Sequence, residues 1–434
     1  MGVGSEAMAV REGSAGYGLQ AAKPSVPVGY KQTEVGIVPD DWEVVSLGEI
    51  GESLIGLTYK PSEVREVGTL VLRSSNIQND KLSFEDNVFV DADISERIMV
   101  RPDDVLICVR NGSRDLIGKS ALLDERTNGM TFGAFMAIYR SPIGRFASYL
   151  FQSSILKRQI NQHLGATINQ ITNKSLNSFV IAAPPSGSEQ RAIATALSDM
   201  DALLDGLDRL IAKKRDLKQA TMQQLLTGQT RLPGFEGEWE EKQLGDCLCS
   251  QPDYGINAAA VPFSDRLPSY IRITDISEYG RFCPEPWVSV NAANADQYFL
   301  RDGDVVFART GASVGKSYLY QPQDGQLVFA GFLIRVRPNP EFLIAGYLAA
   351  YANTKPYWDW VNLMSMRSGQ PGINGKEYAQ LPIQLPPADE QAAITTILSD
   401  MDAEIESLEQ RRLKTNDVKQ AMMQELLSGR TRLV

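Results

Sequence analysis

The chain has 434 residues, of which 43% are hydrophobic and 22% are charged, and its formal net charge is −10. This balance is that of an ordinary globular protein with room for two or three domains, and its longest apolar runs are too short to cross a bilayer. The acidic total also argues against simple nucleic-acid binding, because phosphate contacts need clustered Lys and Arg, so any such surface must be local.

In chain order, the first 29 residues are rich in Gly, Ala and Ser, and this composition predicts a disordered extension. These residues show no secretory signal. Residues 30–184 form the first predicted domain, in which short β-branched runs broken by Gly and Pro indicate strands mixed with helices. One predicted strand, 105–109, leads into a glycine-rich segment that begins at Arg110 and ends at Lys119. Its backbone can approach phosphates, and Arg side chains can pair with guanine edges.

A polar stretch, residues 169–174, closes this domain and carries Asn and Gln, which read adenine edges in the major groove. Asn is equally a turn former, and the glycine segment also fits a hairpin turn with solvated charges. The segment 73–76 is a weaker candidate of the same kind. We predict DNA contacts here from Arg110, Asn111, Ser113, Arg114, Lys119, Asn169, Gln170 and Lys174.

The strongest signal is an internal repeat of the next segment. Residues 189–232 and 390–433 align without a gap at an offset of 390 − 189 = 201, with 25 of 44 positions identical. Each copy follows a double proline, and Gly228 or Gly429 stands where a helix would stop. The repeat predicts two long spacer helices, within residues 185–232 and 387–434.

The apolar positions of these helices predict that they pair with each other. Leu203, Leu207, Leu210, Leu217 and Thr221 follow a heptad spacing in the first copy. The second copy keeps Ile405, Leu408, Val418 and Met422 but places Arg411 and Arg412 within the stripe. Because a single helix would expose this stripe, we expect an antiparallel pair with a pseudo-twofold relation between the two halves of the chain.

The second predicted domain, residues 233–386, corresponds weakly to the first. Another predicted strand, 305–307, leads into a second glycine-rich segment from Arg309 to Lys316, and 332–336 is a further expected strand. A polar stretch follows at 367–376, and Thr274-Asp275 after Arg272 is a weaker candidate. We interpret Tyr357, Trp358 and Trp360 as core rather than base-stacking residues. The predicted DNA contacts of this domain are Arg309, Thr310, Ser313, Lys316, Arg367, Gln370, Asn374 and Lys376.

Several chemistries are not supported by the motifs. A nucleotide-binding P-loop needs four residues between its glycine and the Gly-Lys pair, whereas the two segments have five and three. Cys247 and Cys249 do not form a metal site with the single histidine, His163, so we expect reduced thiols. We find no methyltransferase tetrapeptide, no GxGxxG turn and no evident catalytic constellation, so the sequence predicts no catalytic residue and no metal ligand.

The repeated helices, with EQ, LSDMDA, KQ and LL-x-G-x-TRL in each copy, and the paired VRNGS…IGKS and ARTGA…GKS turns resemble specificity subunits of type I restriction-modification systems. The resemblance covers residues 30–434 and implies two α/β target-recognition domains separated by an antiparallel coiled coil. It further implies double-stranded DNA, two methyltransferase subunits and translocating restriction subunits as partners. By the resemblance, S-adenosylmethionine belongs to the methyltransferase and no cofactor to this chain, which would act in the prokaryotic cytoplasm.

The implied function is recognition of a bipartite, asymmetric DNA target with a fixed gap, because the helices repeat closely while the domains diverge. Two other classes stay open. A helical scaffold would hold partner proteins without reading bases, and the Arg- and Lys-bearing glycine turns argue against it. A standalone nuclease or NTPase would need a site that the sequence does not show. The bases that each domain reads cannot be deduced from the linear sequence.

Overall fold

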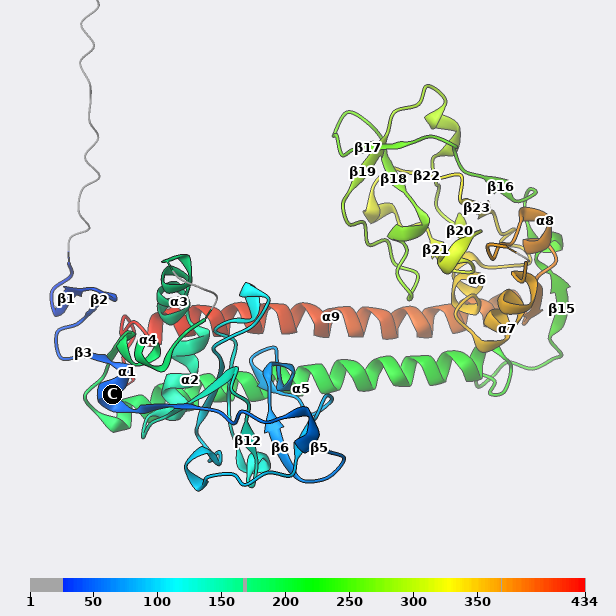
Figure 1. Ribbon diagram of the computed structural model, residues 1–434. Coiled ribbons are helices and arrows are strands. Elements are labelled where there is room, and N and C mark those ends of the chain that lie inside the picture. The colour runs from blue at the N-terminus through cyan, green and yellow to red at the C-terminus, as the bar shows by residue number, and fades with distance from the viewer. Residues whose placement is uncertain (1–25, 167–169, 368, 434) are drawn as a thin grey trace, which may run out of the picture. The chain divides into compact units, whose positions relative to one another are not determined.

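The computed structural model describes residues 26–166, 170–367 and 369–433. These residues form two compact units, each of which combines short strands with helices (Figure 1). Unit 1 holds the described residues up to Leu203 together with those from Thr415 onward, and unit 2 is Leu204–Lys414. Almost all of the predicted extension, 1–29, lies outside the described residues.

Unit 1 is built on two four-stranded sheets. The strand orders are β11-β10-β13-β4 and β12-β6-β9-β5, and β12 pairs with β6 in parallel. Three further pairs are β1 with β2, β3 with β14 and β7 with β8. The strands are β1 Tyr30–Thr33, β2 Gly36–Pro39, β3 Glu43–Ser46, β4 Glu52–Ile55, β5 Val64–Arg65, β6 Thr69–Leu72, β7 Ile77–Gln78, β8 Lys81–Leu82, β9 Phe89–Val90, β10 Val105–Cys108, β11 Ser120–Leu122, β12 Thr131–Phe132, β13 Met136–Arg140 and β14 Val180–Ala183. Its shorter helices are α1 Leu47–Ile50, α2 Gly144–Gln152, α3 Ser154–Ala166 and α4 Asn173–Ser178.

Unit 2 repeats this plan. Its four-stranded sheets have the orders β16-β23-β20-β21 and β17-β19-β18-β22, with β18 and β22 parallel, and β15 pairs with β24. The strands are β15 Glu240–Gln243, β16 Asp253–Tyr254, β17 Ala260–Pro262, β18 Ser269–Ile271, β19 Val288–Val290, β20 Val305–Ala308, β21 Ser317–Leu319, β22 Leu327–Phe329, β23 Leu333–Val336 and β24 Pro382–Leu385. Its shorter helices are α6 Ala345–Tyr351, α7 Lys355–Met364 and α8 Gly375–Tyr378. The strands expected from the β-branched runs are thus confirmed.

The central strand of each unit separates two hydrophobic cores. Successive side chains of a strand point to opposite faces, so the fully apolar strand β10 supplies both sides. Val105 and Ile107 enter one cluster, and Leu106 and Cys108 enter the other. Strand β20 of unit 2 divides its residues between two clusters in the same way. A continuous apolar run here marks a strand that is covered on both faces.

The two long helices are α5, Gly187–Leu226, and α9, Ala388–Leu426. Both end just before the glycines that the sequence indicated, Gly228 and Gly429, whose φ angles are +69° and +70°. A left-handed φ is favourable for glycine, which lacks a Cβ, and it stops the helix. The predicted helices and their ends are therefore confirmed.

Ion pairs show that α5 and α9 run antiparallel within each unit. In unit 2, Lys218 on α5 contacts Asp402 on α9 at 2.7 Å, while Asp208 contacts Arg412. The residue number therefore falls along one helix as it rises along the other. In unit 1, Lys419 and Asp201 lie 2.6 Å apart. The offset of 201 residues converts this pair into Lys218 and Asp402, as expected for an internal repeat.

The repeat also relates two ion pairs that join the segment after the end of one long helix to the start of the other. Arg432 binds Glu189 in unit 1, with Nη2 and Oε2 2.8 Å apart, and Arg231 binds Glu390 in unit 2 at 2.6 Å. Both glutamates are buried, Glu189 being 2% exposed. Each guanidinium also lies over a tryptophan ring, Arg432 over Trp42 at 5.9 Å and Arg231 over Trp239 at 5.7 Å.

The prediction of which face of α5 is buried is wrong, because most residues of the predicted heptad seam are exposed. Leu207 is buried, but Leu203, Leu210 and Leu217 are 42%, 39% and 50% exposed. Leu204 and Ile211, which lie outside the predicted seam, are buried beside Leu207. On α9, Ile405 is buried and Val418 is exposed. Apolar residues lie on two adjacent faces of α5, and the linear pattern does not say which face meets the partner helix.

We expect Arg432→Ala to destabilise unit 1 by about 3 kcal/mol, because it leaves the buried carboxylate of Glu189 without its cation. The value is at the low end for a buried pair, since the Arg432 side chain is 28% exposed. Hydrogen–deuterium exchange read by mass spectrometry separates the units by peptide and should show lost protection in unit 1 alone. Arg430→Ala removes an exposed neighbouring pair and is the control. Unchanged exchange in Arg432→Ala would disprove this role.

Candidate nucleic-acid interface

The two glycine-rich segments form the same turn in the two units. Each connects antiparallel strands, β10 to β11 in unit 1 and β20 to β21 in unit 2. Gly118 N donates to Cys108 O at 2.8 Å, and Gly315 N donates to Ala308 O at 3.0 Å. Both glycines have a φ of +88°. The Lys that follows leads into a strand rather than a helix, so the turn lacks the helix N-terminus on which a P-loop binds phosphate.

Two tyrosines support the turn of unit 2 from the core. Tyr357 donates its hydroxyl to Gly315 O at 2.6 Å, and Tyr378 donates to Ala308 O at 3.0 Å. Burial raises the pKa of both hydroxyls, so they stay protonated as donors. Tyr357 is fully buried and Trp358 and Trp360 are packed against the same cluster, as the sequence predicted. The turn is therefore bonded to two buried side chains of the unit 2 core.

The turns and the polar stretches, predicted as separate candidates, meet in both units. Residue Arg110 forms an antiparallel bridge with Gln170, and Ile171 N donates to Val109 O at 2.8 Å. In unit 2, Thr310 forms the equivalent bridge with Gly372, and Ile373 N donates to Arg309 O at 2.9 Å. About sixty residues of chain separate the partners in each case, which is why the sequence did not reveal this contact.

Some predicted contacts also have partners within the protein. Lys119 Nζ donates to Ile77 O at 3.1 Å, and Arg367 Nη2 donates to Glu377 Oε1 at 2.6 Å. Asn374 is the N-cap of α8, and its Oδ1 accepts a hydrogen bond from Glu377 N at 3.0 Å. Further bonds of this kind join Asn111 to Ser74 at 3.4 Å, Arg114 to Asn161 O at 3.4 Å and Thr310 to Pro371 O at 3.3 Å. These bonds orient the side chains, and the DNA contacts themselves stay predictions.

Most of the predicted contact residues, including some with these internal bonds, are open to solvent. The exposed residues are Arg110, Ser113, Arg114, Gln170, Lys174, Arg367, Gln370, Asn374 and Lys376, and Arg309, Thr310, Ser313 and Lys316 are half-buried. Asn169 lies outside the described residues. The guanidinium of Arg309 stacks on the ring of Tyr254 at 4.9 Å, and that of Arg110 stacks on Phe135 at 5.1 Å. Each turn thus presents an arginine supported by an aromatic ring.

The weaker candidates are engaged in ion pairs inside their units. Arg73 pairs with Asp86 at 2.8 Å, and Arg272 pairs with Asp275 at 2.7 Å. Asn76 and Asp275 are buried and bind the backbone N–H of Arg73 and Arg272. These matched segments cap short turns, and their DNA contacts stay predictions.

Aromatic residues at the turns were missed. Phe135 and Phe332 are 57% and 58% exposed at matching positions, just before β13 and β23. A signal was present in the sequence, because Phe132-Gly-Ala-Phe135 and Phe329-Ala-Gly-Phe332 repeat the same spacing in the two domains.

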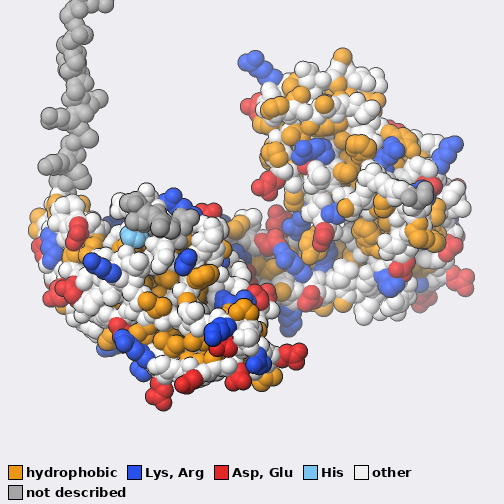
Figure 2. Space-filling model, in the orientation of Figure 1, with side chains coloured by type: hydrophobic (Ala, Val, Ile, Leu, Met, Phe, Trp, Pro, Cys, Tyr) orange, Lys and Arg blue, Asp and Glu red, His pale blue; other side chains and the backbone are white. Residues whose placement is uncertain are grey.

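Charge is mixed on the surface. Figure 2 shows Lys and Arg interspersed with Asp and Glu on the face that it draws. No cluster of three or more His, Cys, Asp or Glu side chains suited to a metal ion occurs among the described residues. Cys108 and Cys247 are buried, and Cys249 and Cys283 are exposed free thiols. In the same described part of the chain, no helix has the length and apolar character to span a membrane.

Comparison with known proteins identifies the family of this duplicated fold. Residues 39–213 and 236–415 match the family model of the type I restriction modification DNA specificity domain. The chain belongs to this family. It is 24% identical to the EcoKI specificity subunit of Escherichia coli over 428 residues, covering 91% of this chain and 90% of that protein. It is also 24% identical to the StySPI specificity subunit of Salmonella potsdam over 405 residues, covering 87% and 85%.

A solved structure supports the fold. The S subunit of a type I restriction-modification system from M. genitalium aligns with a TM-score of 0.53 at 14% identity, covering 89% of this chain and 96% of that chain. The predicted architecture, two mixed α/β recognition domains with two long antiparallel helices in an internal repeat, is thereby confirmed. The chain is a specificity subunit with two DNA-recognition domains, and it is not one of the catalytic subunits.

Proposed function

We propose that this specificity subunit reads a bipartite, asymmetric DNA sequence, with one half-site for each domain and a gap set by the length of α5 and α9. The observation that carries the proposal is the duplicated turn, in which an arginine stands beside an amide-bearing stretch in both units. Arginine and amide side chains are the groups that pair with guanine and adenine edges.

The asymmetry of the target follows from the divergence of the two turns. The backbone bonds of the turn are shared, but Asn111, Arg114 and Gln170 of unit 1 have no identical counterparts in unit 2. Different side chains on one backbone frame favour different bases. The domain boundaries that we propose are residues 30–184 and 233–386, with the spacer helices within 185–232 and 387–434.

The proposed partners are double-stranded DNA, two methyltransferase subunits and, in the full complex, the restriction and translocation subunits. S-adenosylmethionine would serve the methyltransferase subunits, and the complex would act in the prokaryotic cytoplasm. The exposed Leu210 and Leu217 of α5 support a protein partner, because apolar side chains one heptad apart on a helix are suited to a packed interface.

We expect the isolated chain to bind DNA weakly and to gain strong binding only with methyltransferase subunits, because a net charge of −10 repels the DNA polyanion. Titration of a labelled random-sequence duplex with the chain alone and with the reconstituted complex measures the difference. Nanomolar binding by the isolated chain at physiological salt would contradict this expectation. A complex that assembles but methylates without sequence preference would make the chain a scaffold.

Alanine at Arg110 or Arg309 should weaken recognition of one half-site by about 1–3 kcal/mol, the value of an arginine that reads a base. Methylation of a randomised library by the reconstituted complex resolves the two half-sites. Arg97→Ala and Arg301→Ala are controls, because these residues lie near the opposite ends of the central strands. A loss that is equal for all sequences would indicate a phosphate contact, and no loss would remove both arginines from the interface.

A further inference from the structure

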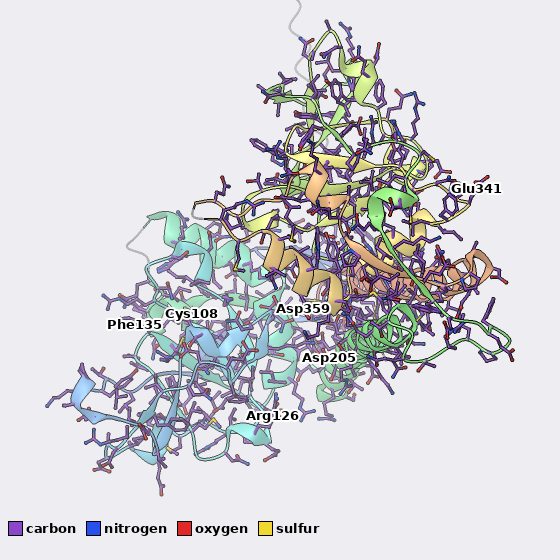
Figure 3. The ribbon with its side chains drawn as sticks, turned by 90° about the vertical axis from the view of Figure 1, so that its right-hand side faces the viewer. Cys108, Arg126, Phe135, Asp205, Glu341 and Asp359 are labelled. Carbon is purple, nitrogen blue, oxygen red and sulfur yellow. The ribbon has the colours of Figure 1, made fainter. Side chains whose placement is uncertain are left out.

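Phe135 and Phe332 expose their rings at the same point of the two units. Phe135 immediately precedes strand β13, and Phe332 immediately precedes strand β23. The next residue is buried in each case, Met136 in unit 1 and Leu333 in unit 2. The other phenylalanines of the repeated spacing, Phe132 and Phe329, are fully buried. One ring of each pair thus anchors the segment in the core while the other ring stays in solvent. Figure 3 shows Phe135 beside Cys108 at the edge of its unit.

The backbone holds both exposed rings in place next to the arginine of the turn. Phe135 O accepts from Val109 N at 3.0 Å and from Arg110 N at 3.1 Å. Phe332 O accepts from Arg309 N at 3.0 Å. Isolated exposed apolar residues are common on protein surfaces and need no explanation. Here, however, a large ring recurs at one bonded position in two domains that have otherwise diverged, which favours a shared role.

The neighbours of the rings point to DNA as the occupant. The guanidinium of Arg110 lies over the ring of Phe135, and both residues are exposed. Gln170 is bridged to the same arginine, and Thr310 follows the arginine of unit 2. Base edges in the major groove offer this combination of partners, with acceptors and donors for arginine and amide groups and the thymine methyl group for an apolar side chain.

We propose that Phe135 and Phe332 contact DNA bases, one in each half-site, and that their rings make the apolar part of the readout beside the turn arginines. This inference rests on the proposed function and adds to it two contact residues that carry no charge. Because the rings are exposed in the free chain, their loss should change DNA binding without changing the stability of either unit.

Site-specific photocrosslinking tests the proposal directly. We would place p-benzoylphenylalanine at position 135 or 332 in the reconstituted complex, bound to a duplex whose target is known from methylome sequencing. We expect crosslinks from 135 to bases of one half-site and from 332 to bases of the other. Val67 and Phe342, 83% and 46% exposed, are control positions that should not reach the bases. Crosslinks from 135 and 332 to a partner polypeptide would overturn the proposal.

Substitution provides the second measurement. Phe135→Ala and Phe332→Ala should each lower affinity for the target about tenfold, whereas Phe342→Ala should leave it unchanged. If an alanine variant is unstable in thermal unfolding, the crosslinks decide, because the photoreactive residue keeps an aromatic side chain. Sequence-selective methylation by the wild-type complex tests the proposed function separately. Selective wild-type methylation with unchanged alanine variants would reject only the role of the two rings, whereas unselective wild-type methylation would reject the function itself.

Discussion

Exchange of residues 233–386 for the matching segment of another specificity subunit should replace one half-site completely and leave the other half-site and the gap unchanged. The segment can be exchanged as a module because its first and last strands, β15 and β24, pair with each other in a register from Glu240 with Leu385 to Gln243 with Pro382. The exchanged segment therefore contains the complete site of unit 2, which is the glycine-rich turn, the buried tyrosines that support it and the polar stretch. Methylome sequencing of a host that carries the hybrid system measures both half-sites and the gap.

The reciprocal exchange of residues 30–184 is the matched control, since β3 and β14 close the first domain in the same way. It should change only the other half-site. A hybrid that alters both half-sites together, or that methylates one uninterrupted sequence, would refute the model of two independent readers.

Insertion of one heptad into each long helix should lengthen the unread gap by about three base pairs. Seven helical residues add about 10 Å, and duplex DNA rises about 3.4 Å per base pair. The insertions belong at facing positions, between Asp208 and Arg215 on α5 and between Glu409 and Arg412 on α9, because ion pairs bracket both sites. Seven residues make nearly two full turns, so the buried face is almost preserved.

We expect weaker methylation at the new gap, because three base pairs also turn the duplex by roughly a third of a turn and DNA must twist to compensate. Methylome sequencing again gives the outcome, and both half-site sequences should remain intact. Insertion into only one helix is the control. It should abolish methylation, because the ion pairs between α5 and α9 on one side of the insertion would no longer be in register. An unchanged gap in the double insertion would show that the helices do not set it.

Much of this architecture was determined by the sequence alone. The offset of 201 residues, the double prolines and the terminal glycines located both long helices, and the swapped pairs Glu189 with Arg432 and Glu390 with Arg231 show why their ends are so similar. The strand before each glycine turn was also predictable, because fully apolar runs are short and bounded. These features are local or repeated, so they are visible in the linear sequence.

The tertiary structure alone decided the rest. It placed Leu203, Leu210 and Leu217 in solvent, because the choice between two apolar faces of a helix depends on what packs against it. It joined each turn to a polar stretch about sixty residues away, since backbone pairing between distant segments leaves no periodic trace. It also separated the buried from the exposed phenylalanines of two identical spacings, because burial depends on the packed sheets and is not a property of the residue type.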